Sequence, residues 1–291
     1  MIHIADAWKD YQVIATGDGY KLERWKDVCL LRPDPQVIWK AQRDLFSYPG
    51  IDAVYHRSDK GGGGWEYRRP IPQEWTISYR DLTFKIKPMG FKHTGLFPEQ
   101  AVNWEVMASL IRGAERPVRV LNLFAYTGGA TVACAKAGAE VTHVDAAKGM
   151  VERAGENARL SGIDRGIRYI VDDCKKFVQR EIRRGNRYDA IVMDPPSYGR
   201  GPNGEMWKIE SELYPFVQLC TQVLSERPLF FLINSYTTGL QPAVLSNILT
   251  LCLRGHKGKI DAYEVGLPTQ EGICLPCGAG GIFIDDAAKR G

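Results

Sequence analysis

The sequence has no hydrophobic run long enough to cross a membrane and no strong excess of charge of one sign. None of its 291 residues lie in a stretch approaching the roughly 18 apolar residues that a spanning helix needs. Lysine and arginine total 38 against 34 acidic residues, a net charge of +4. This balance permits a nucleic-acid partner without demanding one. The amino-terminal residues also lack a basic segment followed by an apolar one, so we predict no secretory signal.

Cysteine is scarce as well, with seven residues scattered along the chain. An odd and scattered set fits reduced thiols better than a disulfide framework. Cys274 and Cys277 have the spacing of half a zinc site, but no second pair of ligands with such a spacing accompanies them. We therefore expect a cytoplasmic protein that has no metal site and no contact with a membrane.

Residues 1–88 contain short β-prone runs separated by turn signals and show no helical periodicity. They predict a small β-rich N-terminal domain, followed by a second domain over residues 89–291. A glycine-rich segment at residues 60–65 is flanked by basic side chains. Such a loop could contact a nucleic-acid backbone, but a hairpin tip with solvated charges is the better interpretation.

Strands and helices alternate strictly from Pro117 onward, after an amphipathic helix at about residues 101–112. This pattern predicts a mostly parallel sheet covered by helices on both faces, a Rossmann-like α/β fold with seven strands. The last segment, residues 272–285, has no helix before it. We expect it to pair antiparallel at the edge of the sheet. The predicted strands are 118–124, 140–145, 166–171, 188–194, 228–234 and 260–266, and the helices are 130–137, 148–161, 173–184, 210–225 and 240–254.

One strand-to-helix turn has the layout of a nucleoside site. Residues 118–129 read as a buried strand, a tight turn that includes Gly128, and the start of a helix. The next strand ends at Asp145, whose carboxylate can accept hydrogen bonds from ribose hydroxyls. A dinucleotide site requires further glycines, and Phe124 and Tyr126 fill two of those positions. The turn therefore favours a nucleoside that carries a carboxylate and no phosphate, which points to S-adenosylmethionine.

Four predicted strand ends place polar groups at one edge of the sheet, where parallel sheets bind their ligands. Asp173 is suited to accept a hydrogen bond from an adenine amino group, although an acid at such a place often only caps a helix. The residues that we expect to bind the cofactor at this edge are Phe124, Ala125, Tyr126, Thr127, Gly128, Asp145, Asp173 and Asp194.

The Asp-Pro-Pro-Ser-Tyr motif at residues 194–198 carries the predicted chemistry. Two prolines remove two N–H donors, so we expect carbonyl oxygens and the Asp194 carboxylate to face the pocket without hydrogen-bond partners. These acceptors can hold an amino group while Tyr198 stacks on a planar ring. Methyl transfer from an activated donor depends mainly on proximity and alignment. We predict Asp194, Pro195, Pro196 and Tyr198 to be catalytic.

These motifs, together with residues 92–100, resemble the bacterial class I S-adenosylmethionine-dependent methyltransferases of the ribosomal RNA large-subunit type. The resemblance covers roughly residues 80–285. It implies a β-rich domain followed by a Rossmann-like methyltransferase domain. It also implies that residues 94–100 help to close the cofactor pocket, which adds Thr94, Phe97 and Gln100 to the predicted cofactor-binding residues.

Members of this family that make 5-methylcytosine carry a nucleophilic cysteine after the fifth strand, where residues 233–237 here read Ile-Asn-Ser-Tyr-Thr. Methylation at carbon 5 needs a covalent adduct with a thiolate. The absence of this cysteine therefore favours a nitrogen acceptor. We therefore predict an enzyme that methylates a nucleobase nitrogen in ribosomal RNA, with RNA as its partner. A small metabolite or a protein side chain remains an alternative substrate. A non-catalytic binding protein on the same scaffold is a further alternative.

Overall fold

The computed structural model describes residues 1–58, 62–90, 92–200 and 206–286, and the chain forms two compact units. Unit 1 comprises Met1–His3, Val102–Glu264 and Gly278–Gly291. Unit 2 comprises Ile4–Ala101 and Val265–Cys277, so two separate segments of the chain build it. The domain boundary that we placed after residue 88 stays a prediction.

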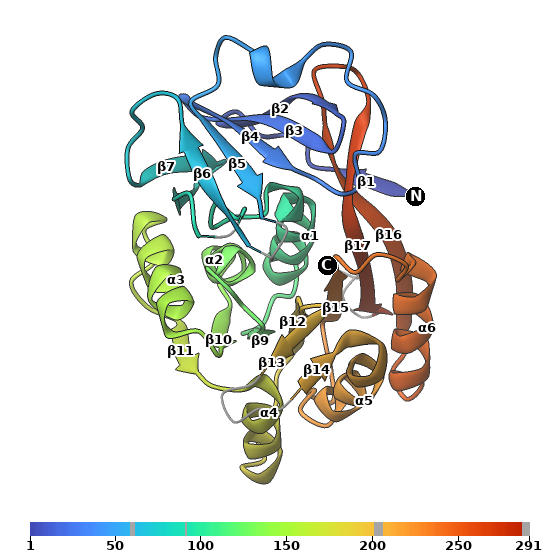
Figure 1. Cartoon of the computed structure of the whole chain (residues 1–291). Coiled ribbons are helices and arrows are strands. Elements are labelled where there is room, and N and C mark those ends of the chain that lie inside the picture. Colours follow the sequence, from blue (N-terminus) through green and yellow to red (C-terminus); the bar gives the residue numbers. More distant parts are fainter. Residues whose placement is uncertain (59–61, 91, 201–205, 287–291) are drawn as a thin grey trace. The chain divides into compact units, whose positions relative to one another are not determined.

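Eight strands in the described part of the chain form one large sheet. They are β1 (Ile2–Ile4), β9 (Arg119–Leu123), β10 (Glu140–Asp145), β11 (Ile167–Val171), β12 (Ala190–Met193), β15 (Phe230–Ser235), β16 (Gly258–Pro268) and β17 (Cys274–Asp285). Their order is β1-β16-β17-β15-β12-β9-β10-β11 (Figure 1). The central strands pair in parallel, from β15 through β12 and β9 to β10 and β11.

The parallel strands form because their sequences are continuous apolar runs. All residues of β12 and β15 are buried, as expected of strands covered on both faces. The predicted Rossmann-like sheet with an antiparallel final strand is therefore confirmed. Strand β1 was not predicted, because three partly exposed residues give too short a pattern.

The expected position of the final strand at the sheet edge is wrong. Strand β17 lies between β15 and β16, and pairs antiparallel with β15 from Phe230–Ile284 to Ser235–Ala279. Neighbours close in on both of its faces. A Cβ atom on Gly280 would lie 2.7 Å from the Tyr263 ring, and one on Gly281 would lie 2.7 Å from Leu245 Cβ. The glycine run in this strand thus marks an interior position.

Six helices in the described residues accompany the sheet, and they agree with the predicted helices to within a few residues. They are α1 (Ala101–Arg112), α2 (Gly129–Lys136), α3 (Lys148–Leu160), α4 (Cys174–Arg183), α5 (Ile209–Thr221) and α6 (Pro242–Cys252). Helix α2 packs on α3, and α5 packs on both α4 and α6. Phe177, Phe216 and Leu245 of the latter three helices share one buried core with strand residues such as Phe231.

Unit 2 is rich in β-structure, as predicted. Its strands are β2 (Tyr11–Gly17), β3 (Tyr20–Trp25), β4 (Val28–Pro33), β5 (Ala53–Arg57), β6 (Gly63–Tyr67), β7 (Trp75–Tyr79) and β8 (Leu82–Ile86), with the 3₁₀ turns η1 (Leu45–Ser47) and η2 (Pro98–Gln100). Strands β2 to β6 form one sheet in chain order, and β7 and β8 form a separate hairpin. Strands β5 and β6 also pair antiparallel. This pairing supports the hairpin interpretation of residues 60–65, of which 60 and 61 lie outside the described residues.

No helix among the described residues is long and apolar enough to span a membrane. The same residues contain no group of three or more His, Cys, Asp or Glu side chains placed to hold a metal ion. The thiols of Cys274 and Cys277 both donate to the Leu275 carbonyl, at 3.7 and 3.5 Å.

Candidate active site

The turn after β9 has an unusual backbone. Phe124, Tyr126 and Gly128 all have positive φ angles, at 53°, 50° and 83°. The first two are not glycines, and a left-handed conformation is unfavourable for them by roughly 1–3 kcal/mol each. Such strain collects at ligand sites, where the surrounding structure holds it in place. The turn therefore keeps a glycine-like path even where the sequence provides aromatic residues.

Several contacts fix this path. The Gly128 N–H donates to the Ala125 carbonyl at 3.0 Å, and the next helix starts directly after Gly128. The fully buried Asn157 of α3 donates from Nδ2 to the Thr127 carbonyl at 2.9 Å. A Cβ atom on Gly128 would lie 2.8 Å from Ala154 Cβ, so a side chain is excluded there. These contacts thus fix the backbone of the turn and hold the N-terminus of α2 close to α3.

Asp145, at the end of β10, binds the same turn. Its two carboxylate oxygens accept hydrogen bonds from the backbone N–H groups of Tyr126 at 2.8 Å and Ala147 at 2.9 Å. Each oxygen keeps a second lone pair for a ligand. Sequence reasoning missed this structural role, because a carboxylate at a strand end gives no sign of its backbone partners. The predicted contact with ribose hydroxyls stays a prediction.

Asp173 is the N-cap of α4. Its Oδ1 accepts from the Lys176 N–H at 2.9 Å. The neighbouring Asp172 forms an ion pair with Arg180. The helix-cap interpretation of Asp173 is therefore confirmed. Its predicted hydrogen bond to adenine would have to use the remaining acceptor positions of the carboxylate.

The Asp-Pro-Pro-Ser-Tyr motif leaves β12 and enters a small hairpin formed by β13 (Tyr198–Arg200) and β14 (Met206–Lys208). Pro195 is buried, Asp194 is partly buried, and Tyr198 is 51% exposed. The Pro196 carbonyl accepts a hydrogen bond from Trp207 Nε1 at 2.6 Å. The expectation that this carbonyl has no partner is wrong, because the hairpin brings the indole N–H back onto it.

Trp207 also connects the motif to the turn after β9. Sequence reasoning missed this role. Its ring lies 5.2 Å from the Phe124 ring and 5.6 Å from the Phe216 ring, measured between centroids. Phe124 and Phe216 are themselves 5.7 Å apart. A tryptophan in an otherwise polar segment was the available signal. The Phe124 side chain therefore packs into an aromatic cluster, and only its backbone forms part of the turn after β9.

The ends of β12 and β15 are joined by polar contacts. Ser197 Oγ lies 2.6 Å from Thr237 Oγ1, and the Thr237 N–H donates to Ser235 Oγ at 3.2 Å.

The Phe124 N–H donates to Cys174 Sγ at 3.3 Å. Burial raises the pKa of the Cys174 thiol well above its ordinary value, so the thiol stays protonated and is a poor nucleophile.

The remaining predicted cofactor residues belong to unit 2. Thr94 is fully buried, and its hydroxyl has no hydrogen-bond partner among the described residues. The Phe97 ring lies 5.5 Å from the His93 ring, and Gln100 is buried at the end of η2. The contact of Thr94, Phe97 and Gln100 with a cofactor stays a prediction.

Comparison with known proteins relates this arrangement to one family. A family model described as S-adenosylmethionine-dependent methyltransferase matches residues 52–206, more than half of the chain. A crystal structure of a SAM-dependent methyltransferase from Agrobacterium tumefaciens is 33% identical, with a TM-score of 0.92 over 98% of this chain and 93% of that one. A second structure, solved in complex with SAH, is 18% identical and shares the fold, with a TM-score of 0.75 over 96% of this chain and 76% of that one.

Curated relatives are similar over shorter stretches. The ribosomal RNA large subunit methyltransferase K/L of Allochromatium vinosum is 36% identical over 160 residues, 53% of this chain and 21% of that protein. The ribosomal RNA large subunit methyltransferase K of Neisseria meningitidis is 29% identical over 191 residues, 62% of this chain and 53% of that protein. The chain thus spans about half the length of the curated relatives it matches, or less.

Proposed function

The chain belongs to the S-adenosylmethionine-dependent methyltransferase family, and on that premise we propose that it methylates a nucleobase nitrogen in ribosomal RNA. Its cofactor is S-adenosylmethionine. The observation that carries the proposal is the Asp-Pro-Pro-Ser-Tyr motif, which presents Asp194 and the half-exposed Tyr198 beside the turn that follows β9. The curated relatives named as ribosomal RNA methyltransferases support the choice of RNA.

The residues present fit the cofactor. The turn from Phe124 to Gly128 ends in a helix N-terminus, which favours a carboxylate such as that of the methionine moiety. Asp145 keeps lone pairs for ribose hydroxyls after binding two backbone amides.

The chain's own residues would position the acceptor. S-adenosylmethionine supplies a methyl group on a positively charged sulfur, which needs no further activation. The Asp194 carboxylate can accept a hydrogen bond from an N–H group of the base and take up the proton that the nitrogen releases. The exposed Tyr198 ring offers a face on which a base stacks. A base within folded RNA would have to leave its stack to reach these residues.

A nitrogen acceptor agrees with the thiols of the chain. All seven cysteines are free, and Cys174, which touches the first turn, is buried with a raised pKa. Residues 233–237 at the end of β15, where the nucleophilic cysteine was expected for carbon-5 chemistry, contain no cysteine but asparagine, serine and threonine. A ring carbon would need a thiolate to activate it, whereas a nitrogen attacks the methyl group through its own lone pair and needs alignment and, where it carries a proton, a group that takes up this proton.

Transfer of labelled methyl groups tests the proposal. The protein is incubated with labelled S-adenosylmethionine and, in parallel, with ribosomal RNA lacking modifications, with a protein pool and with a metabolite pool. We expect the label in the RNA. Label in protein or small molecules, with none in RNA, would contradict the RNA substrate and leave the methyltransferase assignment intact.

A further inference from the structure

A buried ionic network lies within unit 2. Glu23 of β3 is fully buried, and its carboxylate accepts from Arg32 Nε at 2.6 Å, Arg32 Nη2 at 2.8 Å and the Tyr11 hydroxyl at 2.6 Å. Lys21 Nζ lies 3.1 Å from Asp34 Oδ2. The two carboxylates of the network are therefore each engaged by a cation.

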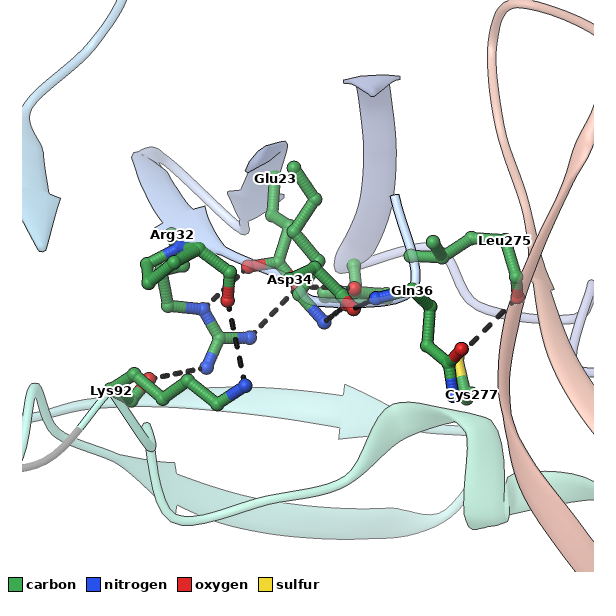
Figure 2. Close-up of polar contacts among 10 residues, drawn as sticks. Glu23, Arg32, Asp34, Gln36, Lys92, Leu275 and Cys277 are labelled. Atoms are coloured by element: carbon green, nitrogen blue, oxygen red, sulfur yellow. Dashed lines mark hydrogen bonds and ion pairs between the residues drawn. The ribbon is translucent and has the colours of Figure 1, made fainter. Parts of the chain in front are cut away.

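Arg32 has a further contact, which reaches Lys92. Its Nη1 donates to the Lys92 carbonyl at 2.7 Å, so that Arg32 bridges Glu23 and the main chain of Lys92 (Figure 2). The Lys92 amine has a long contact, 3.5 Å, with the Pro33 carbonyl oxygen. Among the described residues it forms no ion pair with a carboxylate. The two carboxylates of the network, Asp34 and Glu23, are engaged by Lys21 and Arg32 instead.

The surroundings of Lys92 are positive. Burial, and then the charges of Lys21, Arg32 and Arg57, lower its pKa to about 8, with Asp34 as the opposing charge. The pKa of His93 falls to about 4, through burial and then through Arg32, Lys92 and Lys21, so His93 is neutral at pH 7. The described charges that act on Lys92 are therefore mostly positive, which favours the binding of a further anion.

We propose that the Lys92 amine binds a phosphate group, which under the proposed function belongs to the backbone of the RNA substrate. An ammonium group with three N–H donors and one weak contact matches the oxygens of a phosphate. The Glu23–Arg32 pair fixes the main chain from which the Lys92 side chain extends. A backbone contact of this kind positions RNA without reading its sequence.

Salt dependence of RNA binding gives the first test. The affinity of ribosomal RNA for the wild type, Lys92→Ala and Lys40→Ala is measured at several salt concentrations. Lys40 is a surface control, 94% exposed and paired with Asp18. For Lys92→Ala we expect the slope of log affinity against log salt to shrink by about 0.7, the value for one single-stranded phosphate contact. An unchanged slope in Lys92→Ala would overturn the proposal and leave the RNA substrate in place.

Inorganic phosphate gives a test without RNA. Lysine side chains labelled with ¹³C are titrated by NMR in chloride and in phosphate, and Lys92→Ala identifies the Lys92 signal. We expect phosphate to raise the pKa of Lys92 from about 8 by half a unit or more. The same shift with SAH, which carries a carboxylate, and none with phosphate would overturn the proposal. A phosphate shift in a protein that binds no ribosomal RNA would support the phosphate site and contradict the proposed substrate.

Discussion

Among single residues, those of the turn after β9 follow a backbone path that glycine usually adopts, although two of them are aromatic. Phe124 and Tyr126 keep left-handed backbones because their neighbours bind them. The Tyr126 N–H is held by Asp145, and the Phe124 ring packs on Trp207. The sequence predicts the turn and its acid, since strand, turn and helix follow one another directly. It does not predict the aromatic cluster, because Trp207 is distant in sequence and its segment is otherwise polar.

Gly128→Ala tests the turn geometry. Residue 128 has a φ angle of 83°, which is unfavourable for alanine, and the new Cβ would lie 2.8 Å from Ala154 Cβ. We therefore expect the free energy of unfolding to fall by roughly 1–3 kcal/mol and the cofactor to bind more weakly. Gly138→Ala is the matched control, with φ at 103° and open space around its Cβ. It should destabilise less and leave cofactor affinity unchanged. Equal effects of the two variants in denaturation and calorimetry would contradict the close packing at Gly128.

Asp145→Ala tests the acid at the end of β10. Its removal frees two backbone amides and deletes the predicted ribose ligand, so we expect S-adenosylmethionine to bind more than about tenfold more weakly, or 1.4 kcal/mol. Asp189→Ala is the control, because its carboxylate likewise accepts from a backbone N–H, that of Arg119 at 2.9 Å. Calorimetry that finds equal affinity for the wild type and Asp145→Ala would exclude Asp145 from the cofactor site.

At the scale of elements, the prediction succeeded where local pattern decides and failed where distant pairing decides. Strands β12 and β15 and helices α1 to α6 follow from apolar runs and periodicity. The place of β17 depends on which strands it joins, and pairing between segments far apart in sequence leaves little local trace. The glycines at 280 and 281 were the one local sign, because only a strand pressed on both faces requires them.

The sheet of unit 2 depends on a buried charge that links β2, β3 and β4. Burial alone would raise the pKa of Glu23, but Arg32, Lys21 and hydrogen bonds from Arg32 and Tyr11 lower it to about 2. A carboxyl with a depressed folded pKa stabilises the fold above its unfolded pKa. This contribution is lost as the pH falls from about 4.5, the value of an unperturbed carboxyl, toward 2.

Glu23→Gln tests that link. The change leaves the Arg32 guanidinium buried without its anion, so we expect a loss of roughly 3–5 kcal/mol at pH 7. The stability of the variant should also vary less than that of the wild type between pH 4.5 and 2. Glu66→Gln, which breaks an exposed contact with His56 and Arg68, is the control and should change little. Denaturation curves at several pH values that coincide for the wild type and Glu23→Gln would contradict this account.

For the whole molecule, different observations support the assignment of the cofactor and that of the substrate. The cofactor follows from a turn, a strand-end acid and a family match that covers residues 52–206. The substrate depends on the proposed acceptor side of the site. There the motif at residues 194–198 leads into the pairing of residues 198–200 with 206–208, which no local pattern predicts. The chain also spans about half the length of its curated relatives or less, so a relative's substrate is a proposal for this chain.

Mass spectrometry of nucleosides from ribosomal RNA treated with the wild type and with Asp194→Ala identifies the methylated atom and the role of Asp194. We expect the wild type to add one methyl group to a nucleobase nitrogen. Asp194→Ala should lose this activity while keeping most of its affinity for S-adenosylmethionine, because under the proposed function its carboxylate acts mainly on the acceptor. A methyl group on a ring carbon or a ribose, or equal methylation by Asp194→Ala, would contradict the account.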